Sequence, residues 1–205
     1  MPPMPGMTNG DGNPANNGMK HILVSLDGTD LAVHVAEPPA TPVTMMSGMG
    51  HDYAMSFEVL ENHYFNAQYG WLQELPIVPP AASDVWIKRT GATMPGGATF
   101  RVFEGGMGMD MGSWTMNQIH TEAAEAWKWD RDMQHDLYVA DLPGEYSMSF
   151  EVYLGDATTG EPLAGYGSAT TTLYFTTPVP EPSCAALAGV AVLAVVGCRW
   201  RKSRG

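Results

Sequence analysis

The chain has 205 residues, of which 44% are hydrophobic, and its formal net charge is −12 at pH 7. This length suffices for one domain with its own hydrophobic core. Four of the 10 basic residues stand in the last seven positions, so residues 1–198 carry six basic and 22 acidic side chains, a net charge of −16. Such a body repels the phosphates of nucleic acids, which argues against nucleic-acid binding and leaves cations or uncharged ligands as partners. Acidity also keeps a domain soluble, and this is the favoured explanation of the charge.

Residues 1–19 are rich in proline, glycine, asparagine and methionine, and they lack the apolar run of a secretory signal peptide. We expect this segment to be a disordered tail. If the protein is exported, the favoured explanation of the missing apolar run is a gene start set too late, which clips the true N-terminus. Export without a leader, or no export at all, is the alternative.

Residues 20–177 form the expected body, and apolar residues alternate through most of it with a period of two, which predicts β-strands. The clearest element is a hairpin made of residues 21–26, a turn at Asp27-Gly28, and residues 29–35. An Asp-Gly pair supplies the positive φ values of a tight turn between two strands. We therefore predict an all-β fold, an immunoglobulin-like β-sandwich.

Two segments of this body are nearly identical, YAMSFEV at residues 53–59 and YSMSFEV at residues 146–152. We interpret them as equivalent strands of one sandwich or as chance convergence on a good strand. Residues 121–129 are the one place where a short surface helix fits, and Pro143-Gly144 predicts a chain reversal. Further strands are predicted at residues 84–90, 99–104, 113–119, 137–140 and 169–176.

Six histidines in so acidic a body suggest a metal site, because neutral imidazoles together with a carboxylate are typical zinc ligands. No HxH, HExxH or CxxC motif is present, so any site must be assembled by the fold. The candidate ligands are His34, His51, His120 and His135, which we expect to converge at one end of the sandwich, where loops and strand ends cluster. For each of them the alternative is a solvent-facing or capped histidine, and the residues alone leave the cofactor open.

Methionine and tryptophan offer two further interpretations. Among 15 methionines, Met107, Met109 and Met111 fall on one expected strand face, and thioethers suit Cu(I). Methionine filling an irregular core or a flexible loop is the favoured reading. The tryptophans either line a sugar-binding face or anchor the core, and they are Trp71, Trp86, Trp114, Trp127 and Trp129.

Motifs for catalysis are missing from the sequence. It has no GxSxG motif, no phosphate-binding loop and no dinucleotide fingerprint, and both cysteines lie in the C-terminal apolar run. We therefore predict that the protein is not an enzyme. The alternative is a secreted carbohydrate-active hydrolase that uses carboxylates on the sandwich.

The C-terminal residues 178–205 have three parts in a fixed order. A proline-rich linker contains Val179, Pro180, Glu181, Pro182 and Ser183, then residues 184–198 read CAALAGVAVLAVVGC without a charge, and a basic tail follows with Arg199, Arg201, Lys202 and Arg204. The apolar part, as a helix, extends roughly 23 Å against a hydrocarbon core of about 30 Å, so spanning needs snorkelling arginines or local thinning. The basic tail predicts a cytoplasmic C-terminus and a body outside the cytoplasm. A buried core helix is the alternative.

This order of a Val-Pro-Glu-Pro-Ser run, an apolar helix and an arginine-rich tail resembles the PEP-CTERM sorting signal of Gram-negative bacteria. The resemblance implies export across the inner membrane, transient anchoring by a single hydrophobic helix, and processing near residues 180–182 by a membrane protease of the exosortase type. Delivery to the cell surface or the extracellular matrix would follow.

The body itself resembles the β-domains of choice-of-anchor surface proteins and of PEP-CTERM proteins under zinc-repressor control, through residues 21–34 and 135–175. That resemblance implies a link to extracytoplasmic zinc handling, with histidines as the natural ligands. We therefore expect a membrane-anchored or exosortase-processed surface protein with a non-catalytic β-sandwich, whose ligand is a metal or an extracellular polysaccharide.

Overall fold

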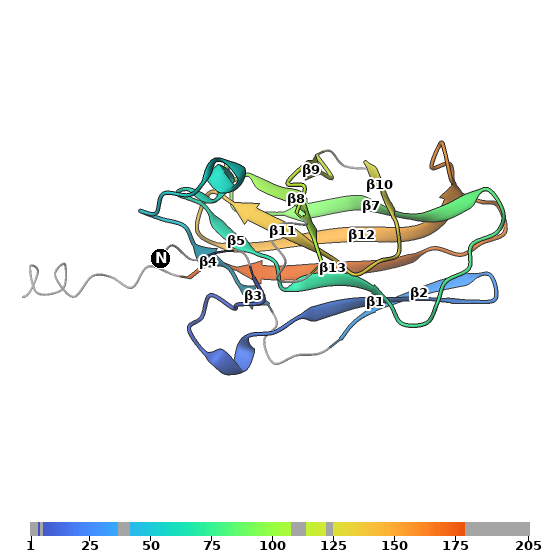
Figure 1. Cartoon of the computed structure of the whole chain (residues 1–205), viewed down its shortest axis with the longest axis horizontal. Helices are drawn as coiled ribbons and strands as arrows, with labels where there is room; N and C mark the ends of the chain where they lie inside the picture. Colours follow the sequence, from blue (N-terminus) through green and yellow to red (C-terminus); the bar gives the residue numbers. More distant parts are fainter. Residues whose placement is uncertain (1–3, 5, 37–41, 108–113, 122–124, 179–205) are drawn as a thin grey trace, which may run out of the picture.

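Two β-sheets packed face to face make up the computed structural model, which describes residues 4, 6–36, 42–107, 114–121 and 125–178 (Figure 1). Side chains from both sheets meet in one buried apolar cluster, as expected for a sandwich. The all-β, sandwich-like architecture predicted from the alternating sequence is thus confirmed.

The larger sheet has eight strands, and β11 lies near its middle. Its main path runs through β2 (Asp30–Val35), β1 (Lys20–Asp27), β6 (Tyr69–Gln73), β11 (Gln134–Ala140), β5 (Tyr64–Asn66) and β4 (Met46–Ser47). Off this path, β8 (Phe100–Gly106) pairs with both β11 and β9 (Gln118–Ile119). The sheet is mixed, because β1 and β6 run parallel while the other pairs are antiparallel.

The smaller sheet has five strands and is mixed as well, since β13 and β3 are parallel. Its order is β10 (Ala126–Trp129), β7 (Ser83–Thr93), β12 (Glu145–Asp156), β13 (Ala169–Thr176) and β3 (Val43–Thr44). Two short 3-10 helices, η1 (Pro14–Asn16) and η2 (Met55–Leu60), complete the regular structure of the described residues.

The predicted first hairpin is confirmed, with its turn at Gly28-Thr29, one residue later than expected. β1 and β2 pair antiparallel from Ile22 opposite Val35 to Asp27 opposite Asp30. Gly28 in the connecting turn has a φ of 62°, a conformation that costs glycine little. The predicted strands at 84–90, 137–140, 146–152 and 169–176 also lie within observed strands, and the one at 99–104 matches β8 from Phe100 onward. The chain reverses at residues 141–144.

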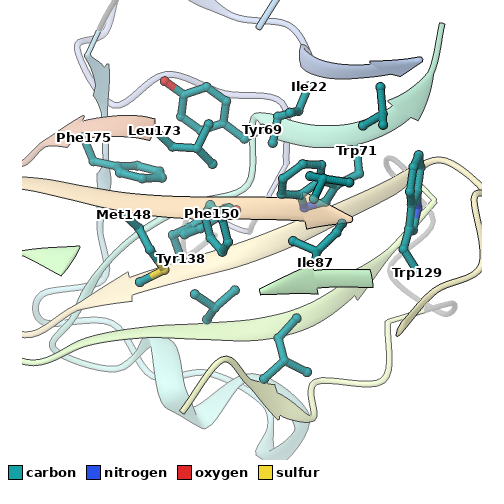
Figure 2. Close-up of a cluster of buried hydrophobic side chains, with 14 of the residues drawn as sticks. Ile22, Tyr69, Trp71, Ile87, Trp129, Tyr138, Met148, Phe150, Leu173 and Phe175 are labelled. Carbon is teal, nitrogen blue, oxygen red and sulfur yellow. The ribbon is translucent and has the colours of Figure 1, made fainter. Parts of the chain in front are cut away.

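The core between the sheets is largely aromatic (Figure 2). Trp71 from the larger sheet meets Phe150 from the smaller one edge to face, with ring centroids 5.6 Å apart. Tyr138 and Phe175 form a second contact across the core at 4.7 Å. Such pairs add about 0.5–1.5 kcal/mol each beyond the area that they bury, so they help to set how the two sheets pack.

A second apolar cluster covers the opposite face of the larger sheet. It contains Phe57, Leu60, Phe65, Ala67, Phe103, Trp114, Leu137 and Val139. β11 therefore lies between two cores: Tyr138 faces the first, while Leu137 and Val139 face the second. This double burial explains why every residue from 135 to 140 is buried.

The prediction that residues 53–59 form a strand was wrong. Residues 55–60 are the 3-10 helix η2, with Phe57 and Leu60 buried in the second cluster. The similar segment at 146–152 lies inside β12, where β7 and β13 pair with it on both sides. The two segments have nearly the same sequence but adopt different structures, because only residues 146–152 have a strand on each side.

Two other local predictions need correction. In the expected helix at 121–129, residues 126–129 form β10, which pairs with β7 and buries Trp129 completely, whereas residues 122–124 lie outside the described part. Of the expected strand at 113–119, only Gln118 and Ile119 are strand among the described residues. Four short strands, β3 to β6, were not predicted, since two to five residues carry too little alternation.

The N-terminal segment also differs from the expected disordered tail. Residues 6–19 pack on the body, and Asn9 is buried. Its side-chain amide donates to Gln68 Oε1 at 3.1 Å, and Gln68 Nε2 donates to the backbone oxygens of Asn16 and Gly18 at 2.9 Å. A buried glutamine thus satisfies the backbone of a segment whose composition alone predicts disorder.

We predict that Gln68→Ala detaches this segment, because the substitution leaves the partly buried backbone oxygens of Asn16 and Gly18 without a donor. The free energy of unfolding should fall by about 2–3 kcal/mol, and amide exchange of residues 9–18 should accelerate. Gln118→Ala, an exposed site in β9, serves as the control and should change stability by less than about 0.5 kcal/mol. Unchanged exchange in Gln68→Ala would show that the glutamine does not hold the segment.

Candidate functional site

The four histidines predicted as metal ligands do not come together. His34 on β2 and His51 are exposed, whereas His120 and His135 are buried. In the part of the chain that the structure describes, no three histidine, cysteine, aspartate or glutamate side chains could hold a metal ion. The predicted convergence at one end of the sandwich is therefore wrong, and these residues do not fit the multi-ligand site that zinc requires.

His135 has instead a different histidine for a neighbour. In the larger sheet, Gly70 of β6 lies opposite His21 of β1 on one side and opposite His135 of β11 on the other. The two imidazole rings lie 6.2 Å apart between centroids, with 58° between their planes. Sequence reasoning missed His21, because no spacing indicates that residues 21, 70 and 135 share one row of a sheet.

Gly70 is the position that allows this arrangement. A Cβ atom there would come within 2.4–2.7 Å of three atoms of the His135 ring. The ring therefore lies directly over the glycine, and any larger residue would displace it. The sequence carried no signal for this position, because the strand β6 that holds Gly70 was not predicted and its pairing is set by the fold.

The protonation state of His135 follows from its partners. Its Nδ1 lies 3.0 Å from the backbone oxygen of Ala67, and since a carbonyl only accepts, Nδ1 carries the proton. Burial lowers the pKa of His135 to about 4, although the hydrogen bond to Ala67 opposes the shift. The ring is thus neutral near pH 7, with a lone pair on Nε2.

That lone pair has no hydrogen-bonding partner. The Nε2 atoms of both His135 and His21 are buried without a hydrogen bond among the described residues. The Tyr69 backbone is near enough to raise the pKa of His135 slightly, yet no hydrogen bond of acceptable geometry joins it to the ring. His63 is a contrast, because its Nδ1 contacts the Glu61 backbone oxygen at 2.6 Å and Arg101 donates to its Nε2 at 3.2 Å.

His120 is a separate buried histidine. Its ring contacts Phe150 and Trp127, with centroids 5.2 Å and 6.4 Å away. Burial lowers the pKa of His120 to about 4, and Arg89 donates a hydrogen bond to its backbone oxygen at 2.9 Å. Its aromatic surroundings make it a core residue.

The carboxyl group of Asp136 lies on the face of β11 opposite to His135, the same face on which Tyr138 lies. Burial raises the pKa of Asp136 to about 7, partly offset by a hydrogen bond that Gln134 donates to Oδ1 at 3.1 Å. Oδ2 has no hydrogen bond among the described residues. The group therefore titrates near neutrality within the fold.

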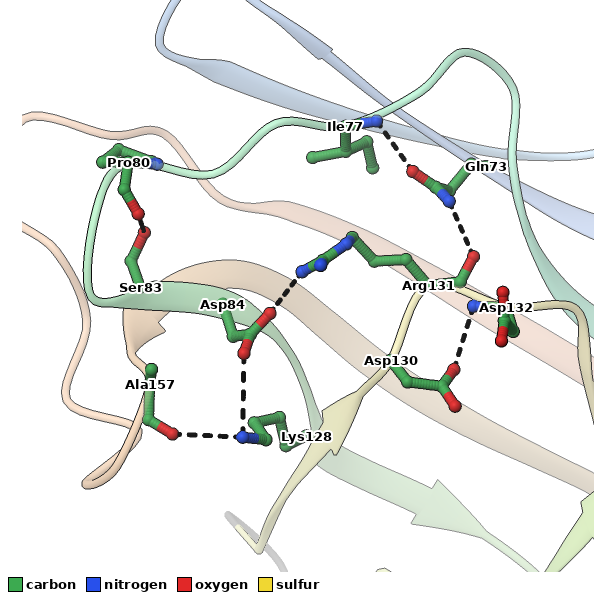
Figure 3. Close-up of polar contacts among 10 residues, drawn as sticks. All are labelled: Gln73, Ile77, Pro80, Ser83, Asp84, Lys128, Asp130, Arg131, Asp132 and Ala157. Carbon is green, nitrogen blue, oxygen red and sulfur yellow. Dashed lines mark hydrogen bonds and ion pairs between the residues drawn. The ribbon is translucent and has the colours of Figure 1, made fainter.

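Asp84 shows how a surface carboxylate is used (Figure 3). It forms ion pairs with Arg131 and, at 3.6 Å, with Lys128. Gln73 donates to the Arg131 backbone oxygen at 2.7 Å, so these contacts link β6 and β7 through the segment that follows β10. Two cations neutralise this carboxylate, which favours a structural role over a catalytic one.

Most of the described methionines and tryptophans discussed above are buried or partly buried. Met45 and Met148 are fully buried in the first core, in agreement with methionine as a core filler. Met107 is 59% exposed, and Met109 and Met111 lie outside the described residues. Trp71, Trp114 and Trp129 are buried anchors, while Trp86 and Trp127 are partly buried.

Comparisons with known proteins add little to this picture. No protein-family model matches the chain, and no curated protein matches it. A solved structure described as the N-terminal domain of PorA matches over 79% of this chain and 88% of that chain, with 11% sequence identity and a TM-score of 0.30. A likeness of that size carries no argument about function.

Asp136 yields a prediction for the pH dependence of stability. Because its folded pKa lies above the unfolded value of 3.8, the native state binds more protons between pH 4 and 7, and this contribution to stability falls as the pH rises through that window. Asp136→Asn should remove this fall in folding stability, so that the variant is more stable than the natural protein at pH 8 by up to roughly 4 kcal/mol. Denaturant unfolding of both proteins from pH 4 to pH 8 measures the difference.

The difference between the two curves isolates Asp136, since His120 and His135 are present in both proteins. Those histidines act in the opposite sense: their lowered pKa values make the native state lose stability as the pH falls from 6.5 to about 4. A constant difference between the two curves would contradict the assignment to Asp136.

Proposed function

We propose that the chain is an exported bacterial surface protein whose non-catalytic β-sandwich is displayed at the cell envelope. The observation that carries the proposal is the order of parts in residues 178–205: a Val-Pro-Glu-Pro-Ser run, 15 uncharged residues and four basic residues among the last seven. Residues 179–205 lie outside the described part of the structure, so the argument for the anchor rests on the sequence.

The proposed route begins with anchoring by the apolar segment, with the basic tail in the cytoplasm and the body outside. A membrane protease of the exosortase type then cuts near residues 180–182 and delivers the body to the surface or the extracellular matrix. Within the described residues, no helix is long and apolar enough to cross a membrane. The finer assignments, an immunoglobulin-like body and a single transmembrane helix, belong to this proposal.

The way in which the body ends supports such processing. Its last strand, β13, pairs with β12 and β3 on its two sides. Thr177 is buried directly after it, where its N–H donates to the Gly144 oxygen at 3.0 Å and its hydroxyl accepts from the Gly144 N–H at 2.7 Å. A cut after residue 178 therefore removes no described strand and no contact of this closing pair.

The partners of the displayed body are proposed on chemical grounds. The net charge of −16 over residues 1–198 favours cations or uncharged molecules such as extracellular polysaccharide. A role in zinc handling is proposed only from the resemblance of the body to proteins under zinc-repressor control, because the described histidines do not form a zinc site.

Cell fractionation tests the proposal. The full chain, expressed behind a secretion leader in a Gram-negative host with an exosortase, should appear first in the inner membrane and then as a shorter form outside it. Alanine at Pro180, Glu181 and Pro182 together should block the shortening and leave the full-length form in the membrane. Alanine at Arg199 and Arg201 should instead weaken retention or orientation in the membrane without altering the Pro-Glu-Pro run. Full-length protein that stays in the cytoplasm with its tail intact would overturn the proposal.

We also expect a chain that ends after Pro178 to keep the stability of the full chain. The expected change in unfolding temperature is below about 2 °C, because both cores, as far as the structure describes them, consist of residues before Pro178. A chain that ends after Thr172 loses the buried Leu173 and Phe175 and should not unfold cooperatively. Loss of cooperative unfolding in the chain that ends after Pro178 would show that residues after 178 contribute to the fold.

A further inference from the structure

Three residues lie side by side in one row across β1, β6 and β11 of the larger sheet: His21, Gly70 and His135. No side chain separates the two imidazoles, since the residue between them is glycine. Both rings lie on the face opposite to the inter-sheet core, because Ile22 and Asp136, their neighbours along the strands, point the other way. Ile22 belongs to that inter-sheet core, and Leu137, two residues beyond His135, belongs to the second apolar cluster.

The separation of the rings suits one shared ion. The centroid of an imidazole lies roughly 1.1 Å from its nitrogens and a metal–imidazole bond is about 2.0–2.1 Å, so two rings that bind one ion in line have centroids roughly 6.3 Å apart. The observed separation is 6.2 Å.

The nitrogens are also available. Both Nε2 atoms are buried and make no hydrogen bond among the described residues, and His135 must carry its proton on Nδ1. A buried nitrogen without a partner costs free energy, and a bound cation would offset that cost. His135 is fully buried, whereas His21 is only partly buried.

The number of donors selects the metal. Two imidazoles are neighbours here, and no third histidine, cysteine or carboxylate joins them among the described residues. Zinc takes four ligands in structural sites, whereas Cu(I), a closed-shell monovalent ion, is stable between two nitrogens in line. We propose that His21 and His135, with Gly70 between them, form a two-coordinate site for Cu(I). The site does not depend on the proposed export, because it lies wholly within the body.

Competition with a Cu(I) chelator under anaerobic, reducing conditions tests the site on the full chain in detergent. We expect one Cu(I) per chain, and a loss of affinity of at least 10-fold in His21→Asn and in His135→Asn. X-ray absorption of the loaded protein should show two nitrogen neighbours. His21 is partly buried, so its variant keeps the test decisive even if His135→Asn unfolds.

Matched controls separate the site from adventitious copper. His34→Asn, an exposed histidine on β2, should retain full affinity. Gly70→Ala should lose affinity because its methyl group displaces the His135 ring, while Gly91→Ala, where a Cβ meets nothing within 4 Å, should retain it. Full affinity in His21→Asn, or affinity that disappears only when the exposed Met55 and Met107 become leucine, would overturn the proposal.

Discussion

The central constraint on this fold is the burial of β11 on both faces. Tyr138 of this strand packs into the core between the sheets, and Leu137 and Val139 pack into the second cluster on the far side. Neighbouring strands satisfy its backbone through β5, β6 and β8. Both cores and the order of the larger sheet therefore depend on one seven-residue strand.

The same strand carries the polar groups that are most difficult to bury. His135 and Asp136 are adjacent and point to opposite faces, each with one atom that lacks a hydrogen bond among the described residues. Burial favours the neutral form of both groups, so it lowers one pKa and raises the other. These two residues make the interior sensitive to pH, and a neutral imidazole with an unused lone pair is also a ligand that copper accepts.

The β-sandwich and the C-terminal residues 178–205 place separate requirements on the sequence. The body closes at Thr177 through its contacts with Gly144, and among the described residues its cores contain none beyond Phe175. The proposed anchor needs only an apolar run and a basic stop, which impose nothing on the sandwich. A surface protein that is anchored and later cut needs this independence, because processing must leave the displayed domain folded.

The sequence by itself determined the all-β class, the Asp27-Gly28 hairpin and the long strands β7, β12 and β13, since alternation and turn residues act locally. The composition of the last 28 residues likewise carried the proposed sorting role. Only the tertiary structure decided that residues 55–60 are helical while their near copy is a strand, that Gln68 orders the N-terminal segment, and that His135 neighbours His21 rather than His34 or His51. The physical reason is that strand pairing is a long-range interaction: a residue's neighbours across a sheet depend on order and register, and no local pattern in the chain encodes them.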